Sequence, residues 1–304
     1  MRRCFFFVKG FALRAKETKL LKKVSKPMPQ PFSDVPVRFL TCSLGRLAYR
    51  VHGPASGTVT LLLHGFGQNQ HAFHAFLSLR GKEERYISID LFFHGLSSWS
   101  KASKRLLPKD WAAILQQLMA AEKFNSFHLV GYSMGGKFSL ISYQELPKQV
   151  LSLTLLAPDG IKTGFWYNIS NFPGIFEGLF KRTVLDPNRF FTWMHGLRRI
   201  GLLDKSIVKF IDTQMETRTK RAQVYFTWSV FRKLRPDIQA ILAELRRQPI
   251  PVTLVTGDFD RMVTYENLAY FIEALPAAEH VALASGHNTL IPDYAEYLKN
   301  RRKK

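Results

Sequence analysis

The stretch that decides the fold reads Gly131-Tyr132-Ser133-Met134-Gly135-Gly136, between a predicted strand and a predicted helix. Residues 127–130 before it form a short apolar run typical of a buried strand, and residues 137–146 after it carry apolar side chains at helical spacing. A turn this tight strains the serine backbone, and glycines two positions before and after it let strand and helix approach closely. The pattern predicts an exposed Ser133 hydroxyl at the helix N-terminus. By itself it fits equally well a glycine-rich turn with an incidental serine.

Strand-like and helical patterns alternate along most of the chain. Beyond a hairpin predicted around residues 43–46, buried strands are predicted at 58–63, 86–91, 127–130, 150–157, 252–256 and 280–284. Helices are predicted at 111–119, 137–146, 267–275 and 294–299. This alternation predicts an α/β fold with a doubly wound, mostly parallel sheet. We assign residues 37–160 and 236–300 to this core and residues 161–235 to an insertion.

The formal net charge of +21 is concentrated at the ends of the chain. Residues 1–27 contain nine Lys or Arg and one acidic residue, and five of the last six residues are basic. We expect residues 1–36 to be a solvated basic tail and linker, and a peripheral contact of this tail with an anionic membrane is the second interpretation. No nucleic-acid partner is expected, because no nucleic-acid-binding motif accompanies the charge.

The cysteine count and the hydropathy pattern bear on the compartment. Cys4 and Cys42 are too few for a disulfide framework, which is compatible with a reducing cytoplasm. No apolar run approaches the roughly 18 residues of a membrane-spanning helix. We therefore expect a cytoplasmic protein that contacts a membrane, if at all, through its basic tail.

Segments after five of the predicted strands carry motifs. They are His64-Gly65-Phe66-Gly67, residues 90–97, residues 131–135, residues 256–260 and Ser285-Gly286-His287-Asn288. In this order they resemble the α/β-hydrolase superfamily, in particular its small-molecule esterase and C–C hydrolase branch. The resemblance covers roughly residues 37–300, with 161–235 much less typical. It implies an α/β-hydrolase fold with a nucleophile elbow at residues 131–135.

The resemblance also implies a catalytic triad in the chain order serine, acid, histidine, here Ser133, Asp260 and His287. Asp260 is favoured as the acid because residues 257–260 match the G-x-x-D pattern after a strand. Asp258 and Asp159 stay open as alternatives. In such a triad the acid orients the histidine, which takes the proton of the serine.

Further residues gain roles from the same resemblance. The oxyanion donors are expected to be the backbone N–H groups of Phe66 and Met134. His64 is expected to stabilise its loop rather than act as a base. Residues 90–97 resemble a D-x-x-G-x-G-x-S segment but have Phe93 where glycine is usual, and His94 in this segment is expected to be structural.

The insertion at residues 161–235 is the predicted source of substrate preference. It holds fourteen aromatic residues and fourteen Lys or Arg against five Asp or Glu. We interpret it as a helical cap whose apolar side chains suit an acyl chain or an aromatic ring. Its arginines could hold an anionic group, but a solvated charged face explains them equally well, so none is assigned.

Three function classes follow, in order of preference. The first is a serine hydrolase that cleaves a small or medium acyl ester or thioester through an acyl-enzyme. The second keeps the triad for C–C bond hydrolysis or a menaquinone-pathway-type elimination. The third is a non-catalytic, membrane-associated binding protein, which the intact triad disfavours. No metal or cofactor is expected, and His71 and His74, which could pair on a metal, are expected to line the pocket or the surface.

Overall fold

The computed structural model describes residues 35–100, 104–161 and 212–303, together with Asn188, Thr192, Gly196 and Arg199. All but the last two residues of the predicted basic tail and linker at 1–36, and most of the predicted cap, therefore lie outside the described residues. The predicted core at 37–160 and 236–300 lies almost entirely within them.

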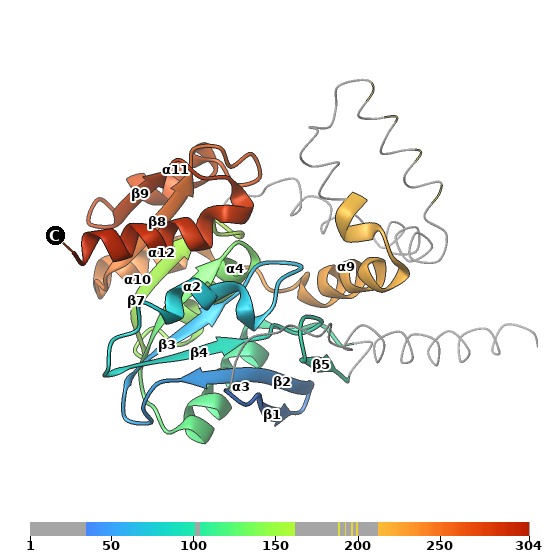
Figure 1. Ribbon diagram of the computed structural model, residues 1–304, viewed down its shortest axis with the longest axis horizontal. Coiled ribbons are helices and arrows are strands. Elements are labelled where there is room, and N and C mark those ends of the chain that lie inside the picture. The colour runs from blue at the N-terminus through green and yellow to red at the C-terminus, as the bar shows by residue number, and fades with distance from the viewer. Residues whose placement is uncertain are drawn as a thin grey trace, which may run out of the picture.

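A nine-stranded sheet forms the centre of the fold (Figure 1). The strands pair in the order β1-β2-β4-β3-β6-β7-β8-β9, and β5 pairs with β2. Every pair from β4 to β9 is parallel, whereas β2 is antiparallel to β1, β4 and β5. The strands are β1 Arg38–Cys42, β2 Gly45–His52, β3 Thr58–Leu63, β4 Glu84–Ile89, β5 Ser98–Trp99, β6 Phe127–Tyr132, β7 Val150–Leu156, β8 Val252–Gly257 and β9 Glu279–Leu283.

Helices cover both faces of this sheet (Figure 1). On one face, Trp111 of α3 meets Phe138 of α4 edge to face, with ring centroids 4.9 Å apart. On the other face, Phe76 of α2 contacts Tyr294 of α12. The described helices are η1 Gln70–Phe73, α2 His74–Leu77, α3 Pro108–Glu122, α4 Met134–Glu145, α9 Arg218–Phe231, α10 Ile238–Arg247, α11 Tyr265–Glu273, η2 His287–Thr289 and α12 Leu290–Arg301. The predicted doubly wound, mostly parallel α/β fold is confirmed.

The central strands are apolar because both of their faces are covered. Leu61 of β3 and Leu129 of β6 are partners in the register and are both fully buried. An alternating pattern would have placed polar side chains beneath one layer of helices. The predicted hairpin also forms, but Cys42 pairs with Gly45, so its turn is two residues long rather than the four residues predicted.

A buried ion-pair network fastens α3 to the first strands. The carboxylate of Glu122 accepts hydrogen bonds from Arg38 Nη1, from the Tyr49 hydroxyl at 2.7 Å and from the guanidinium of Arg85. Arg85 and Glu122 are both more than nine-tenths buried, so each charge is compensated by the other. This network lies at the C-terminal end of α3, outside the motif-bearing loops.

The parallel strands bring the motifs together. Because β3, β6, β8 and β9 run in one direction, the segments that follow them emerge at one edge of the sheet. His64, Ser133, Asp260 and His287 stand in those segments. Helix α9, from the described end of the insertion, lies beyond the same edge (Figure 1). The functional site is therefore expected at this edge.

Candidate active site

The elbow between β6 and α4 is too tight for any side chain at its glycines. A Cβ atom on Gly131 would lie 2.3 Å from Ser139 Oγ, and one on Gly135 would lie 1.9 Å from the carbonyl oxygen of Leu63. Glycine at both positions therefore lets helix α4 sit directly against β6 and β3. The close approach of strand and helix that the glycine pattern predicts is therefore present.

Ser133 adopts a strained backbone conformation. Its φ of 50° and ψ of −116° lie outside the regions that residues with a side chain prefer, at a cost of about 1–3 kcal/mol. Three backbone hydrogen bonds compensate for this strain: Ser133 N–H donates to Leu156 O, and Ser133 O accepts from Gly136 and Asp159 N–H, each at 2.8–2.9 Å. The serine is consequently held in one orientation at the start of α4.

Two hydrogen bonds connect Ser133, His287 and Asp260 in a chain. His287 Nε2 lies 3.1 Å from Ser133 Oγ, and His287 Nδ1 lies 2.6 Å from Asp260 Oδ2. The three residues come from the ends of β6, β9 and β8, more than 150 residues apart at the extremes. This geometry allows the imidazole to accept the serine proton while the carboxylate stabilises the resulting charge.

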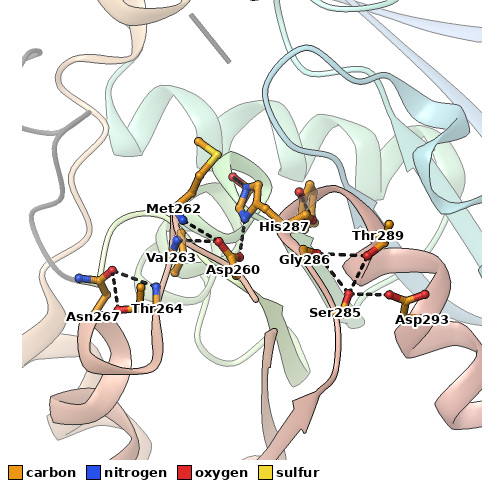
Figure 2. A network of polar contacts seen from close by, with 12 residues as sticks. Asp260, Met262, Val263, Thr264, Asn267, Ser285, Gly286, His287, Thr289 and Asp293 are labelled. Carbon is orange, nitrogen blue, oxygen red and sulfur yellow. Dashed lines mark hydrogen bonds and ion pairs between the residues drawn. The ribbon is translucent and has the colours of Figure 1, made fainter. Parts of the chain in front are cut away.

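Asp260 is held by its own turn as well as by the histidine (Figure 2). Its side chain is completely buried, and Oδ1 accepts the backbone N–H groups of Met262 and Val263 at 2.8 and 2.9 Å. These two hydrogen bonds fix the orientation of the carboxylate. They also leave Oδ2 directed at the imidazole of His287.

The loop that carries His287 is anchored to α12 (Figure 2). The Ser285 hydroxyl lies 2.5 Å from Asp293 Oδ2 and 2.9 Å from the hydroxyl of Thr289. Ser285 is 2% exposed, and both hydrogen bonds are partly buried. They fix the backbone on both sides of Gly286 and His287.

The loop after β3, which we call the donor loop (residues 64–67), is shaped by three hydrogen bonds. Buried His64 has Nδ1 2.7 Å from Gly65 O, and its Nε2 accepts the N–H of Leu91 at 3.0 Å. Burial lowers the pKa of His64 to about 3, so this ring is neutral and structural. Gly65 N–H donates to the side chain of Gln68 at 3.0 Å. Phe66, the expected oxyanion donor, follows within this fixed turn.

The second expected donor, Met134, is the first residue of α4. The N–H groups of a helix's first turn have no acceptor within the helix, and the helix dipole favours negative charge there. The Met134 N–H thus stands next to Ser133 at a helix end suited to a developing oxyanion. The role of Phe66 and Met134 as donors stays a prediction.

Comparison with known families agrees with this architecture. A family model described as "alpha/beta hydrolase fold" matches residues 59–294, which include the donor loop, the elbow, the acid turn and the histidine loop. The chain belongs to the alpha/beta hydrolase family. The predicted family and hydrolase class are confirmed.

Proteins to which this α/β-hydrolase is similar include a lipase, and solved structures with the same fold include an esterase and a thioesterase domain. The chain is 25% identical to Lipase 1 of Psychrobacter immobilis over 276 residues, 88% of this chain and 83% of that protein. An esterase from Thermogutta terrifontis has a similar structure, with a TM-score of 0.63 and 17% identity, covering 88% and 97% of the two chains. The thioesterase domain of a curacin biosynthetic pathway matches with a TM-score of 0.58 and 18% identity, covering 90% and 100%.

The two other candidate aspartates of this α/β-hydrolase have no described hydrogen bond to His287. Asp159, after β7, forms an ion pair with Lys137 at 2.6 Å. Asp258 is exposed, and its charge acts on His280, whose pKa burial nevertheless lowers. The described contacts of the His287 imidazole therefore include Asp260 and neither of these alternatives.

The segment at residues 90–97 buttresses the donor loop. Asp90 is fully buried and accepts N–H groups from Gln70 at 2.6 Å and Leu96 at 2.8 Å, while burial raises the pKa of Asp90 to about 6. Phe93 has a φ of 68°, the conformation that explains why the family pattern has glycine here. Its ring stacks on Phe226 of α9 with centroids 6.0 Å apart. A side chain at this position thus anchors the insertion to the core.

Two glutamines from the described end of the insertion reach the loops around the site. Gln223 Nε2 donates to the Phe93 carbonyl at 2.9 Å. The amide of Gln214 packs on Gly67, where a Cβ would lie 2.9 Å from its Oε1. Sequence reasoning did not single out either residue, because nothing in the local pattern indicates where their side chains point. The insertion therefore contacts the donor loop directly.

His71, which with His74 could have formed a metal site, lies beside a cationic side chain. His71 Nε2 lies 2.8 Å from Arg50 Nη1, and burial with this neighbouring charge lowers the pKa of His71. Within the described ranges, no group of three or more His, Cys, Asp or Glu side chains is placed to hold a metal ion. In the same part of the chain no helix combines the length and apolarity required to cross a membrane.

Proposed function

We propose that this α/β-hydrolase is a serine hydrolase that cleaves a small or medium acyl ester or thioester through an acyl-enzyme. The observation that carries the proposal is the hydrogen-bonded chain from Ser133 through His287 to Asp260. A serine hydroxyl is a weak nucleophile unless a base accepts its proton, and this chain supplies that base.

The first step forms the acyl-enzyme. Ser133 Oγ attacks the carbonyl carbon of the substrate while its proton passes to His287 Nε2, 3.1 Å away. The carboxylate of Asp260 on Nδ1 stabilises the imidazolium that forms. The same proton then moves from Nε2 to the alcohol or thiol leaving group as the bond to that group breaks.

The carbonyl oxygen becomes negative in this step and needs donors. The backbone N–H groups of Phe66 and Met134 are proposed for this task, one from the donor loop and one from the start of α4. Donors that are fixed before the reaction are worth most, because no reorganisation is paid for in the transition state. The hydrogen bonds of His64 and Gln68 support such fixation.

The second step releases the acid. A water molecule gives a proton to His287 Nε2 and its oxygen attacks the acyl carbon. The proton returns to Ser133 Oγ as the acyl–oxygen bond breaks, so the enzyme is regenerated. In both steps Nε2 accepts a proton and then returns it, while Nδ1 stays hydrogen-bonded to Asp260.

The proposed substrate class draws on two kinds of support. Relatives include Lipase 1 of Psychrobacter immobilis, and solved structures with the same fold include an esterase and a thioesterase domain. Within the donor loop, the apolar side chain of Phe66 is partly exposed and packs edge to face on His94. Apolar walls beside a serine suit an acyl chain better than a charged group.

A chain-length series of p-nitrophenyl acyl esters, with matched thioesters, tests the proposal. We expect turnover of short to medium esters, a burst of p-nitrophenol that reports the acyl-enzyme, and a loss of at least about 10³-fold in the Ser133→Ala variant. Folded protein that turns over no ester or thioester would contradict the proposal. Turnover of a vinylogous diketone with only weak ester activity would instead favour C–C bond hydrolysis.

A further inference from the structure

Tyr132 is the residue that precedes the serine of the elbow, and its side chain is not exposed to solvent. It is the last residue of β6 and only 3% exposed. The elbow pattern accepts any residue at this position, so the sequence assigns no task to it. Its surroundings do, because they consist of parts of two different motif-bearing loops.

The hydroxyl of Tyr132 holds the backbone of the histidine loop. It donates a hydrogen bond to the carbonyl oxygen of His287 at 2.6 Å. The two rings also contact each other, with centroids 5.1 Å apart and planes inclined by 40°. The imidazole of His287 is thus restrained on one side by Tyr132 and at Nδ1 by Asp260.

The tyrosine ring also touches the donor loop. A Cβ atom on Gly65 would lie 2.7 Å from Cε1 and 2.8 Å from Cδ1 of Tyr132, so the loop backbone packs directly on the ring. The next residue is Phe66, the proposed oxyanion donor. A shift of the ring would therefore reach the donor loop and the histidine loop together.

The hydroxyl is chemically suited to this role. Burial and the nearby Asp260 charge raise the pKa of Tyr132 above its ordinary value. The phenol consequently remains protonated and remains a donor at all pH values at which the protein would be assayed. Because an unpaired buried hydroxyl costs free energy, the bond to the His287 carbonyl also defines a single position for the loop.

We propose that Tyr132 is a positioning residue, which sets the His287 imidazole and the Phe66 N–H in register with Ser133. This inference rests on the proposed serine-hydrolase function. In this role the ring of Tyr132 aligns both the proton acceptor, His287, and the oxyanion donor, the Phe66 N–H. Tyr132 itself forms no covalent bond with the substrate.

The test compares Tyr132→Phe with a matched control, Tyr49→Phe. Both tyrosines are buried and each hydroxyl donates one short hydrogen bond, but that of Tyr49 goes to Glu122 outside the site. With a p-nitrophenyl ester, we expect kcat of Tyr132→Phe to fall about 10- to 100-fold with KM within about three-fold. We expect kcat of Tyr49→Phe to stay within about two-fold of the parent.

A second variant approaches the same ring from the other loop. Gly65→Ala introduces a methyl group against Tyr132, and we expect a similar fall in kcat with a smaller change in KM. Urea unfolding would verify that each variant is folded under assay conditions. Unchanged kcat in both Tyr132→Phe and Gly65→Ala, with an active parent protein, would overturn the inference.

Failure of the proposed function gives a different result from failure of this inference. If the parent protein neither hydrolyses esters nor reacts with a fluorophosphonate, the serine-hydrolase proposal fails. If the parent reacts, the rate of fluorophosphonate labelling in Tyr132→Phe decides. A rate reduced about 10-fold or more supports the positioning role, and a rate equal to that of Tyr49→Phe contradicts it.

Discussion

Three histidines stand in loops at the same edge of the sheet, yet their surroundings differ in kind. His287 is slightly exposed and lies between a buried carboxylate and a serine hydroxyl. His64 and His94 are completely buried beside the donor loop, and each has Nδ1 within hydrogen-bonding distance of a nearby carbonyl. The first arrangement stabilises a protonated ring, whereas the second excludes one. The residue type therefore says less about chemistry than its burial and its partners.

The electrostatics of the two buried rings support this contrast. Burial lowers the pKa of His64 to about 3 and that of His94 to about 4. Protonating either ring would place a charge in an apolar interior without a described carboxylate in contact. The two neutral rings contact each other, and His94 also contacts Phe66, so they support the donor loop by packing.

The largest effect expected from this comparison is on activity at His287. Replacing His287 by Ala removes the base, so we expect kcat/KM for a p-nitrophenyl ester to fall by at least about 10³-fold. A urea titration would verify that the variant is folded under assay conditions, so that the loss reports the missing base. A loss of less than about ten-fold would show that another group takes the serine proton.

The second largest loss of activity is expected at the acid of the triad, and it should be found in only one of three aspartate variants. Asp260→Asn keeps the shape but removes the charge on Nδ1, so kcat should fall about 10²- to 10⁴-fold. Asp159→Asn and Asp258→Asn serve as matched controls, since neither contacts the imidazole, and each should change kcat by less than about three-fold. Steady-state kinetics on the three variants measures these losses. A larger loss in Asp159→Asn or Asp258→Asn than in Asp260→Asn would contradict the assignment of Asp260 as the acid.

The buried rings should affect stability rather than the chemical step. His64→Ala opens a cavity and leaves the Leu91 N–H unpaired, for an expected loss of about 2–4 kcal/mol in the free energy of unfolding. His94→Leu should cost less, about 1 kcal/mol, because His94 Nε2 has no hydrogen-bond partner among the described residues. Urea titrations measure both values. Equal losses would mean that the His64 bonds do not hold the loop.

The pH dependence of stability should show the same two rings. A depressed histidine pKa means that the unfolded chain binds more protons, so stability present above about pH 6.5 is lost as the pH falls toward 3–4. Asp90 acts in the opposite direction, since its pKa is raised to about 6. His64 and His94 outweigh it, and His71 and His280, whose pKa values burial also lowers, act in the same direction as these two rings. The unfolding free energy should therefore drop by about 3 kcal/mol or more from pH 7 to pH 4.

Urea titrations across this range would measure that drop. The variant His94→Leu should show a shallower dependence on pH than the parent, because it lacks one of the buried rings whose pKa is lowered. A free energy of unfolding that stays flat between pH 7 and pH 4 would contradict the assignment of these rings as buried and neutral.

The smallest effect concerns the insertion. Gln223→Ala removes the hydrogen bond to the Phe93 carbonyl, worth about 1 kcal/mol, so KM for medium-chain esters should rise about five-fold or less. Gln239→Ala is the matched control, because its amide bonds to the Tyr270 hydroxyl on the outer surface of α10 and α11. A KM equal to that of the control would show that α9 does not influence the substrate.

The sequence was most informative where chemistry and topology coincide. Elbow glycines, strand-like runs and a histidine after the last strand are local signals, and parallel strands carry each of them to one edge. The G-x-x-D pattern named Asp260 ahead of Asp258, and the observed contact of Asp260 with His287 shows how that turn directs its carboxylate. Such turn geometry is encoded within a few residues.

Contacts between distant side chains could not be predicted in the same way. The bond from Tyr132 to the His287 carbonyl spans 155 positions, and the contact of Gln214 with Gly67 depends on how the insertion folds back. In the sequence Phe93 is only a departure from a glycine pattern, whereas in the structure its ring joins α9 to the core. Side-chain direction over such separations is decided by packing, which periodicity does not report.

Labelling with a fluorophosphonate, followed by peptide mass mapping, tests the central claim most directly. The reagent reacts with a serine only where a base has activated it and an oxyanion site receives the phosphoryl oxygen. We predict a single adduct on Ser133 in the folded parent protein and a strongly slowed reaction in His287→Ala. An unmodified Ser133 in folded protein, or an adduct on another serine, would contradict the claim that Ser133, His287 and Asp260 form the active site.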